Sequence, residues 1–226
     1  MKQVDSRGFR TSVFEQFARV TSALSSPRRL EMVDLLAQSE RSVEDLARMA
    51  GLSVANASRH LQILKAARLV DVRREGTYAY YRLADDRVFR AWRAIRDLAD
   101  ARLTELAHVV RSFREDLNGA EPVTAAELLG RMHSGDVVII DVRPEEEYRV
   151  LHVAGASSVP LGRLEAALED LPPDKEVFAY CRGPYCLLSD QAVALLVANG
   201  FRARRMEFGL PDWKDEGLPV ESGADA

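Results

Sequence analysis

The formal charge of this chain changes sign close to residue 118. Residues 1–118 hold 21 Lys and Arg against 16 Asp and Glu, whereas residues 119–226 hold 10 against 19. At the change lie Gly119, which can close a helix, and Pro122, which cannot continue one. Opposite charges in two halves indicate an anion-binding part and an acidic part with another role. The sequence therefore predicts two domains, residues 1–118 and residues 119–226.

The apolar runs and the cysteine count predict the cellular location of the protein. No run reaches the ~18 apolar residues of a membrane helix, and the N-terminus lacks the apolar core of a secretion signal. The chain has only two cysteines, Cys181 and Cys186, which excludes a framework of disulfides. We expect a cytoplasmic protein that does not contact membranes.

A stripe of apolar residues with helical spacing precedes the boundary: Val88, Trp92, Ile95, Ala99, Leu103, Leu106, Val110, Phe113 and Leu117. It predicts one helix of about 30 residues, or ~45 Å at the α-helical rise. Because this is longer than a small domain is wide, we expect the helix to contact a partner as well as its own core. A helix packed wholly on its own domain is the alternative.

The basic half contains the pattern of a helix-turn-helix. Residues 12–24 and 28–38 are amphipathic, and Ser42 begins a third helical segment that Gly51 can close. Ser53 then caps a polar helix from Val54 to about Ala67. A short helix, a glycine turn and a capped polar helix are typical of this motif.

A predicted hairpin follows directly. The β-rich segments 69–74 and 77–83 are separated by Glu75 and Gly76. After a helix-turn-helix, such a hairpin forms a wing, so Arg73 and Arg74 can contact phosphates while the second helix enters the major groove. The alternative is a solvated domain whose charged hairpin binds nothing.

Residues 12–115 resemble the ArsR-type winged-helix repressors. The resemblance rests on Ser26–Met32, on Leu46 and Ala47, and on Ser58–Val70. It implies binding to double-stranded DNA and a homodimer formed through the first helix and the helix around residues 86–117. It also implies a recognition helix whose outward residues contact DNA: Ala55, Asn56, Ser58, Arg59 and Gln62.

The chain departs from the metal-sensing members of that family. Those members place cysteines in the helix before the turn, where this chain reads Val43–Ala47. The last helix of this half offers Asp97, Asp100, Glu105 and His108, without the two-histidine spacing of a zinc site. We expect no metal and no cofactor, so a regulatory signal has to enter elsewhere.

The acidic half alternates predicted strands with predicted helices. Val137–Ile140 and Glu176–Tyr180 are short apolar runs. Helical patterns surround them: Ala125–Met132, Glu145–Val150, Leu164–Leu168 and Leu187–Ala198. This order indicates an α/β domain with a buried, largely parallel sheet, whose ligands bind beyond the carboxyl ends of the strands. Asp141–Arg143 and Cys181–Cys186 follow the two strands at those ends.

The second of these segments can support thiol chemistry. A loop between a strand and a helix start would place the Cys181 sulfur over backbone N–H groups, which lower the pKa of a thiol. Arg182 adds positive charge beside it. The sequence predicts a thiolate nucleophile or a persulfide at Cys181, with an inert buried cysteine as the alternative.

Residues 121–221 resemble a single rhodanese domain. The shared motifs are Asp141–Arg143, Glu147–Tyr148, His152–Ala156, Val159–Pro160, the Cys181 loop, Gly209, Trp213 and Gly217–Val220. The resemblance implies that Cys181 accepts a sulfane sulfur as a persulfide and passes it to a thiol or to cyanide. The rest of the loop would cradle that sulfur: Arg182, Gly183, Pro184, Tyr185 and Cys186. Asp141 and Arg143 would support neighbouring loops.

Two positions at the end of the loop refine this prediction. Phosphatases and arsenate reductases of the same fold carry an oxyanion-binding arginine six positions after the cysteine, where this chain has Leu187. Sulfur chemistry is therefore favoured. Cys186 is either a second thiol that resolves the persulfide or a small buried side chain.

The predicted function is a DNA-binding transcriptional regulator whose rhodanese domain senses or handles sulfane sulfur from a small donor, with a thiol as acceptor. The alternative is a sulfurtransferase enzyme with an accessory DNA-binding domain. An arsenic- or metal-responsive repressor is disfavoured, because the ligands are missing.

Overall fold

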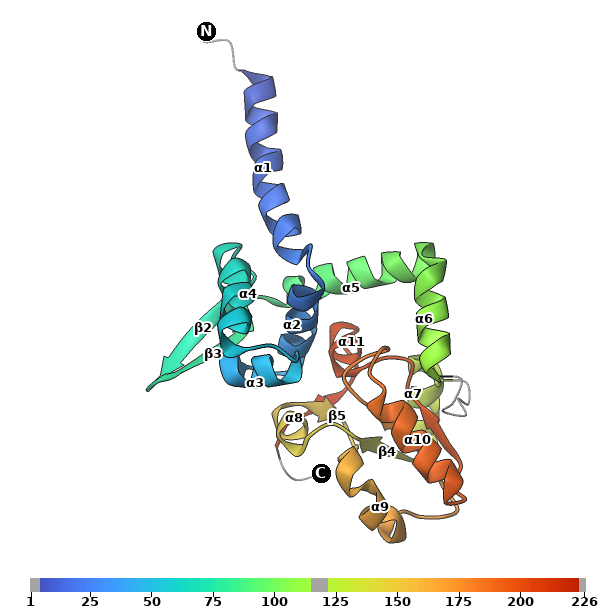
Figure 1. Ribbon diagram of the computed structural model, residues 1–226. Helices are drawn as coiled ribbons and strands as arrows, with labels where there is room; N and C mark the ends of the chain where they lie inside the picture. The colour runs from blue at the N-terminus through green and yellow to red at the C-terminus, as the bar shows by residue number, and fades with distance from the viewer. Residues whose placement is uncertain (1–4, 115–121, 224–226) are drawn as a thin grey trace. The chain divides into compact units, whose positions relative to one another are not determined.

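The computed structural model describes residues 5–114 and 122–223 (Figure 1). The chain forms two compact units, Met1–Trp92 and Arg93–Ala226. The division falls inside one helix, α5 (Asp86–Arg102). The predicted domain boundary between residues 118 and 119 lies outside the described residues.

The first unit has the order of a winged helix-turn-helix (Figure 1). Its elements before α5 are α1 (Ser6–Leu24), α2 (Pro27–Gln38), β1 (Arg41–Ser42), α3 (Val43–Met49), α4 (Val54–Ala66), β2 (Val70–Glu75) and β3 (Tyr78–Leu83). The strands form an antiparallel sheet in the order β1-β3-β2. The predicted helix-turn-helix and hairpin are confirmed.

Local capping explains the turn between α3 and α4. The Ser42 side chain accepts a hydrogen bond from the Asp45 amide, and the Ser53 side chain accepts one from the Asn56 amide. Gly51, between the two helices, has a φ of 62°, a left-handed conformation that favours glycine. The wing turn likewise contains Gly76, with a φ of 59°.

One apolar core holds this unit together. Met32 of α2, Leu46 of α3 and Leu61 and Leu64 of α4 are fully buried in it. Trp92 packs at its edge, where its indole N–H donates to Asp34 Oδ1 at 3.0 Å. These contacts fix the orientation of α4, so the polar face of that helix stays outward.

The prediction of one continuous helix over residues 88–117 is wrong in one respect. The structure has two helices, α5 and α6 (Thr104–Arg114), with a break at Leu103, while Leu117 lies outside the described residues. Apolar spacing continues across the break and cannot reveal it. Each helix is held by its own ion pairs, Arg96 to Asp212 and Arg114 to Asp190, and these partners lie on different elements.

The second unit is an α/β domain built on a parallel sheet in the order β6-β4-β7-β8. Its elements after α6 are α7 (Ala125–Ser134), β4 (Val137–Asp141), α8 (Glu145–Val150), β5 (His152–Val153), β6 (Ser157–Ser158), η2 (Leu161–Arg163), α9 (Leu164–Ala167), η3 (Leu168–Asp170), β7 (Glu176–Tyr180), α10 (Leu188–Ala198), β8 (Ala203–Arg205), α11 (Leu210–Asp215) and β9 (Val220–Glu221). The expected parallel sheet is confirmed.

Both faces of this sheet are covered. Along β7, Val177 and Ala179 point into one apolar cluster with α10, whereas Phe178 and Tyr180 point into another with Trp213 of α11. This alternation explains why the strand reads as an unbroken apolar run. Cys181 follows β7 directly and belongs to the α10 cluster.

No helix in the described ranges is long and apolar enough to span a membrane.

Candidate functional site

The outward face of α4 carries the residues predicted to contact DNA. Ala55, Asn56, Arg59 and Gln62 are exposed and Ser58 is half-buried, whereas Ala57 and Leu61 face the core. The Gln62 amide donates to the Tyr81 hydroxyl of β3 at 3.1 Å, which ties this side chain to the wing.

The two arginines of the wing differ in their surroundings. Arg73 is paired with Glu40 at 2.6 Å and with Glu75 at 2.6 Å, and its guanidinium lies over the Tyr80 ring at 4.8 Å. Arg74 is exposed, and it makes no ion pair with any described residue. Arg74 is therefore an exposed cation of the wing that no described carboxylate balances.

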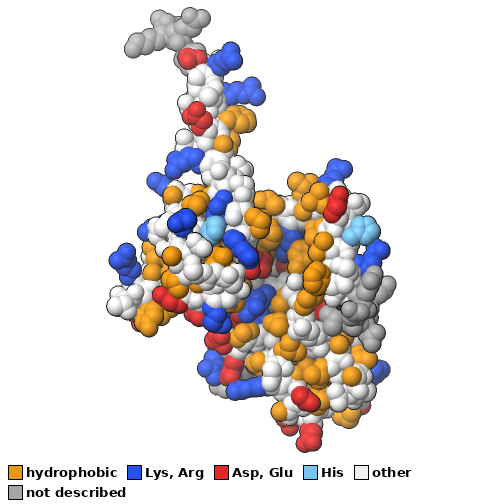
Figure 2. Space-filling model, viewed as in Figure 1, with side chains coloured by type: hydrophobic (Ala, Val, Ile, Leu, Met, Phe, Trp, Pro, Cys, Tyr) orange, Lys and Arg blue, Asp and Glu red, His pale blue; other side chains and the backbone are white. Residues whose placement is uncertain are grey.

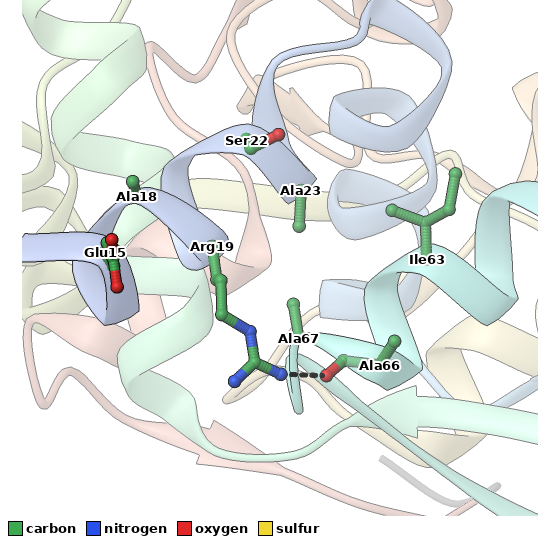
Figure 3. A pocket seen from close by; sticks show the side chains of 8 residues that line it. All are labelled: Glu15, Ala18, Arg19, Ser22, Ala23, Ile63, Ala66 and Ala67. Carbon is green, nitrogen blue, oxygen red and sulfur yellow. Dashed lines mark hydrogen bonds between the residues drawn. The ribbon is translucent and has the colours of Figure 1, made fainter. Parts of the chain in front are cut away.

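A groove of about 470 Å³ separates α1 from α4 (Figure 3). The small side chains of Ala18, Ala23 and Ala67 leave the space open. Across it, Arg19 donates to the carbonyl oxygen of Ala66 at 3.5 Å, the bond drawn in Figure 3. This contact connects α1 to the end of α4.

The cysteine loop lies at the carboxyl edge of the parallel sheet. β4 and β7 are neighbours with Asp141 opposite Tyr180, so Asp141–Arg143 and Cys181–Cys186 emerge at the same edge. The sequence predicted that each segment lies beyond the carboxyl end of its strand. α10 begins just after the loop, at Leu188.

Cys181 is 2% exposed, and its sulfur faces mostly acceptors. Its Sγ lies 3.4 Å from the Cys186 carbonyl oxygen, 3.5 Å from Ser189 Oγ and 3.9 Å from the Gly183 carbonyl oxygen. Burial, together with the neighbouring Cys186 thiol, raises the pKa of Cys181 well above its usual value. The expected lowering of the Cys181 pKa by the loop amides is wrong.

The anion-stabilising groups of the loop act on Cys186 instead. Hydrogen bonding with the Cys181 thiol and with the backbone amides of Arg182 and Leu188 stabilises the anionic form of Cys186. These bonds lower the pKa of Cys186 to about 7. The loop therefore contains a pair of thiols that share a proton near neutral pH.

Arg182 is turned towards Glu147 of α8. Its Nε lies 3.0 Å from Glu147 Oε1 and its Nη2 lies 2.6 Å from the same oxygen, and the Glu147 side chain is fully buried. Most of the Arg182 charge is thus balanced by a carboxylate. The positive charge of Arg182 is a minor cause of the lowered pKa of Cys186.

Asp141 and Arg143 form a buried pair. The Arg143 Nη2 lies 2.6 Å from Asp141 Oδ2 and 2.8 Å from the Leu151 carbonyl oxygen. These bonds connect the end of β4 to the segment after α8. This geometry is the kind that a loop-supporting role requires.

Gly209 packs against the start of the loop. A Cβ at this position would overlap the carbonyl oxygen of Arg182 and crowd the amide of Gly183. Only glycine therefore allows the segment before α11 to lie against the backbone that follows Cys181.

Helices α5 and α6 contact the far side of the loop. The Arg114 guanidinium donates to the Pro184 carbonyl oxygen, and the Tyr185 hydroxyl bonds to Asp100. Arg114 Nε also lies 3.2 Å from Asp190 Oδ1, and Asp190 follows Ser189, the neighbour of Cys181. Arg114 and Asp190 were absent from the predicted site, and Asp100 was considered only as a metal ligand. Arg114 lies 70 residues before Pro184, so no local pattern could reveal it. Asp190 is close to the loop in sequence, but its ion pair with Arg114 depends on the tertiary fold.

The described residues contain no cluster of three or more His, Cys, Asp or Glu side chains that could bind a metal ion. The chemistry available at the loop is that of two neighbouring thiols, one of them acidic, beside an arginine that is paired with a buried carboxylate.

These features define a winged-helix regulator joined to a rhodanese-like domain. The model of the arsR family of bacterial regulatory proteins matches residues 26–72, and the model of the rhodanese-like domain matches residues 124–216.

Similarity also covers almost the whole chain. It is 40% identical to the HTH-type transcriptional regulator Rv0324 of Mycobacterium tuberculosis, over 95% of this chain and 94% of that protein. The chain therefore belongs to the family of ArsR-type transcriptional regulators that carry a rhodanese domain.

Two further relatives each match one half. The homodimeric winged helix-turn-helix DNA-binding domain (fragment 1-100) of Mb0332 from Mycobacterium bovis is 43% identical, covers 46% of this chain and 93% of its own, and has a TM-score of 0.41. A sulfurtransferase of Allochromatium vinosum is 29% identical over 38% of this chain and 78% of its own length.

Proposed function

We propose that this transcriptional regulator binds operator DNA as a homodimer, and that sulfane sulfur accepted at Cys181 changes its affinity for DNA. The donor is a small molecule with a sulfane sulfur. Cys181 attacks it as a thiolate, which hydrogen bonds from the hydroxyl and the amide of Ser189 stabilise against the effect of burial. A thiol removes the sulfur again. The observation that carries the proposal is the bond from Arg114 of α6 to the Pro184 carbonyl oxygen inside the cysteine loop.

That bond matters because a persulfide is a small chemical change. It can alter DNA affinity only if it shifts an equilibrium between two arrangements of the protein. Arg114 holds both the loop, at Pro184, and the start of α10, at Asp190, so a rearranged loop moves the end of α6.

Exposed apolar faces support the homodimer. On α1, the side chains of Phe9, Phe14 and Phe17 are between 57% and 70% exposed. On α5 and α6, Leu98 is 62% exposed and Phe113 is 65% exposed. Figure 2 shows hydrophobic side chains exposed between the charged residues of α1. Large apolar side chains gathered on exposed helices are typical of interaction surfaces.

DNA contact is assigned to the outward face of α4 and to the wing. Asn56 and Arg59 can contact base edges, Ala55, Ser58 and Gln62 flank them, and Arg74 can contact phosphates. Arg73 reaches DNA only by leaving Glu40 and Glu75.

The test measures operator affinity of the full chain before and after treatment with thiosulfate, using a duplex selected by the protein from random sequences. We expect a change of about fivefold or more, equivalent to a coupling near 1 kcal/mol. Cys181→Ser should retain basal DNA binding and lose the response. Equal affinities, after sulfite release has confirmed the reaction with thiosulfate, would contradict sensing and favour a sulfurtransferase as the function.

A further inference from the structure

The loop holds a second thiol that the proposed function does not use. Cys186 is half-buried, and hydrogen bonding with the Cys181 thiol and with the amides of Arg182 and Leu188 favours its thiolate. Its backbone is fixed as well, because the Cys186 amide donates to the Gly183 carbonyl oxygen at 3.1 Å and its own carbonyl oxygen lies 3.4 Å from Cys181 Sγ. The loop is therefore a closed turn that brings the Cys186 backbone against the Cys181 sulfur.

We propose that Cys186 is a second reacting thiol, whose thiolate attacks the inner sulfur of a Cys181 persulfide, expels hydrosulfide and closes a Cys181–Cys186 disulfide. This inference rests on the proposed persulfide at Cys181. After exposure to sulfane sulfur, the loop therefore contains a Cys181–Cys186 disulfide.

The step balances without an outside oxidant. The bond between the Cys181 sulfur and the outer sulfur breaks, and its electron pair leaves with the outer sulfur as hydrosulfide. The bond between the sulfurs of Cys181 and Cys186 forms from the electron pair of the Cys186 thiolate. The sulfane sulfur is reduced and the two cysteines are oxidised. A thiol reductant restores the pair by thiol–disulfide exchange.

The surroundings of the two sulfurs favour attack on the inner atom. Attack on the outer sulfur would expel the Cys181 thiolate into a site that is 2% exposed, where burial disfavours the anion. Thiols of lower pKa leave faster, so hydrosulfide departs more readily than the buried Cys181 thiolate. An attacking thiol is most effective when its pKa is near the ambient pH, as it is for Cys186.

A disulfide here also acts on the contacts to α5 and α6. Pro184 and Tyr185 lie between the two cysteines, and they are the loop residues bonded to Arg114 and Asp100. Closing the bridge restrains the segment that carries both of these contacts. Formation of the disulfide therefore affects the loop more than the single added sulfur atom of the persulfide does.

The experiment treats the full-length wild type, Cys186→Ser and Cys181→Ser with thiosulfate under anaerobic conditions. Sulfite is measured as the product of persulfide formation, and hydrosulfide is measured as the product of the proposed second step. Intact mass is recorded with non-reducing peptide mapping. Untreated wild type, kept anaerobic, controls for oxidation by air.

We expect the wild type to release hydrosulfide and sulfite in equal amounts and to lose about 2 Da as the disulfide forms. Cys186→Ser should release sulfite alone and keep an added mass of about 32 Da, one sulfur atom, on Cys181. Cys181→Ser should release neither product.

Two results overturn the inference. One contradicts the disulfide step alone, and the other also contradicts the proposed persulfide. A wild type that keeps the added sulfur and releases no hydrosulfide contradicts the disulfide step alone, and the persulfide proposal stands. Absence of sulfite from both the wild type and Cys186→Ser contradicts the persulfide and therefore both proposals. The wild-type ratio of the two products needs no variant, so a folding defect in Cys186→Ser cannot obscure the result.

Discussion

Arg182 and Glu147 form a bidentate ion pair at the cysteine loop, in which Arg182 Nη2 lies 2.6 Å from Glu147 Oε1. Glu147 is fully buried, and Arg143 lies 3.9 Å from its other carboxylate oxygen. The carboxylate therefore balances positive charge that would otherwise be buried behind the thiols.

Glu147→Gln should destabilise the protein, because it removes the carboxylate that balances the partly buried charge of Arg182. We expect a loss of about 3 kcal/mol in the free energy of unfolding, measured with urea. Glu146→Gln is the matched control, since Glu146 is exposed, and it should change stability by less than about 0.5 kcal/mol. Equal effects of the two substitutions would contradict a structural role for the pair.

The reactivity of Cys186 should depend on pH with a midpoint near its pKa of about 7. Below that value the sulfur is protonated and unreactive, and above it the thiolate is alkylated by iodoacetamide. Cys181→Ala removes a hydrogen-bond donor, so the midpoint should move upward. Cys181→Ser retains a donor and should move it less. A midpoint that is the same in the alanine variant and in the wild type would rule out this cause.

The wing should bind phosphate mainly through Arg74. Arg74→Ala should weaken binding to all DNA sequences and reduce the slope of log affinity against log salt by about one. Arg73→Ala should change the slope less, because Arg73 is paired with Glu40 and Glu75. Salt titrations of both variants test this order, and a larger slope change for Arg73→Ala would reverse it.

Base recognition should depend on the exposed face of α4. Arg59→Ala should reduce discrimination between the selected operator and random DNA by about 1–3 kcal/mol. The reason is that contacts to base edges carry sequence information, whereas phosphate contacts do not. Competition binding measures the ratio. A uniform loss of affinity for both DNAs would instead indicate that Arg59 contacts a phosphate.

The connection between the loop and α6 should depend on Arg114. Arg114→Gln shortens the side chain that reaches Pro184 and Asp190, so persulfide formation should persist while the DNA response falls. Arg111→Gln is the matched control, because Arg111 is exposed one turn earlier on the same helix. The readouts are sulfite release and operator affinity in the same samples. A full response in Arg114→Gln would exclude this route.

Local patterns in the sequence predicted most elements of both units. Ser42, Gly51 and Ser53 mark the ends of α3 and α4, because capping and left-handed turns depend on residues within one helical turn. The apolar run of β7 and the position of Cys181 after it likewise located the loop at the carboxyl edge of the sheet.

Only the tertiary structure determines the pKa values of the loop thiols and the partners of the buried and wing arginines. The pairing of Arg73 with Glu40 and of Arg182 with Glu147 joins segments more than 30 residues apart. The pKa of each thiol depends on where the sulfurs and amides lie once the loop is folded, so the expected lowering of the Cys181 pKa was wrong. The break between α5 and α6 is similar in kind, since ion pairs to Asp212 and Asp190 hold the two helices. Periodicity reports the neighbours along a chain, whereas the pKa of a group and its ion pairs are set by whatever folding brings into contact with it.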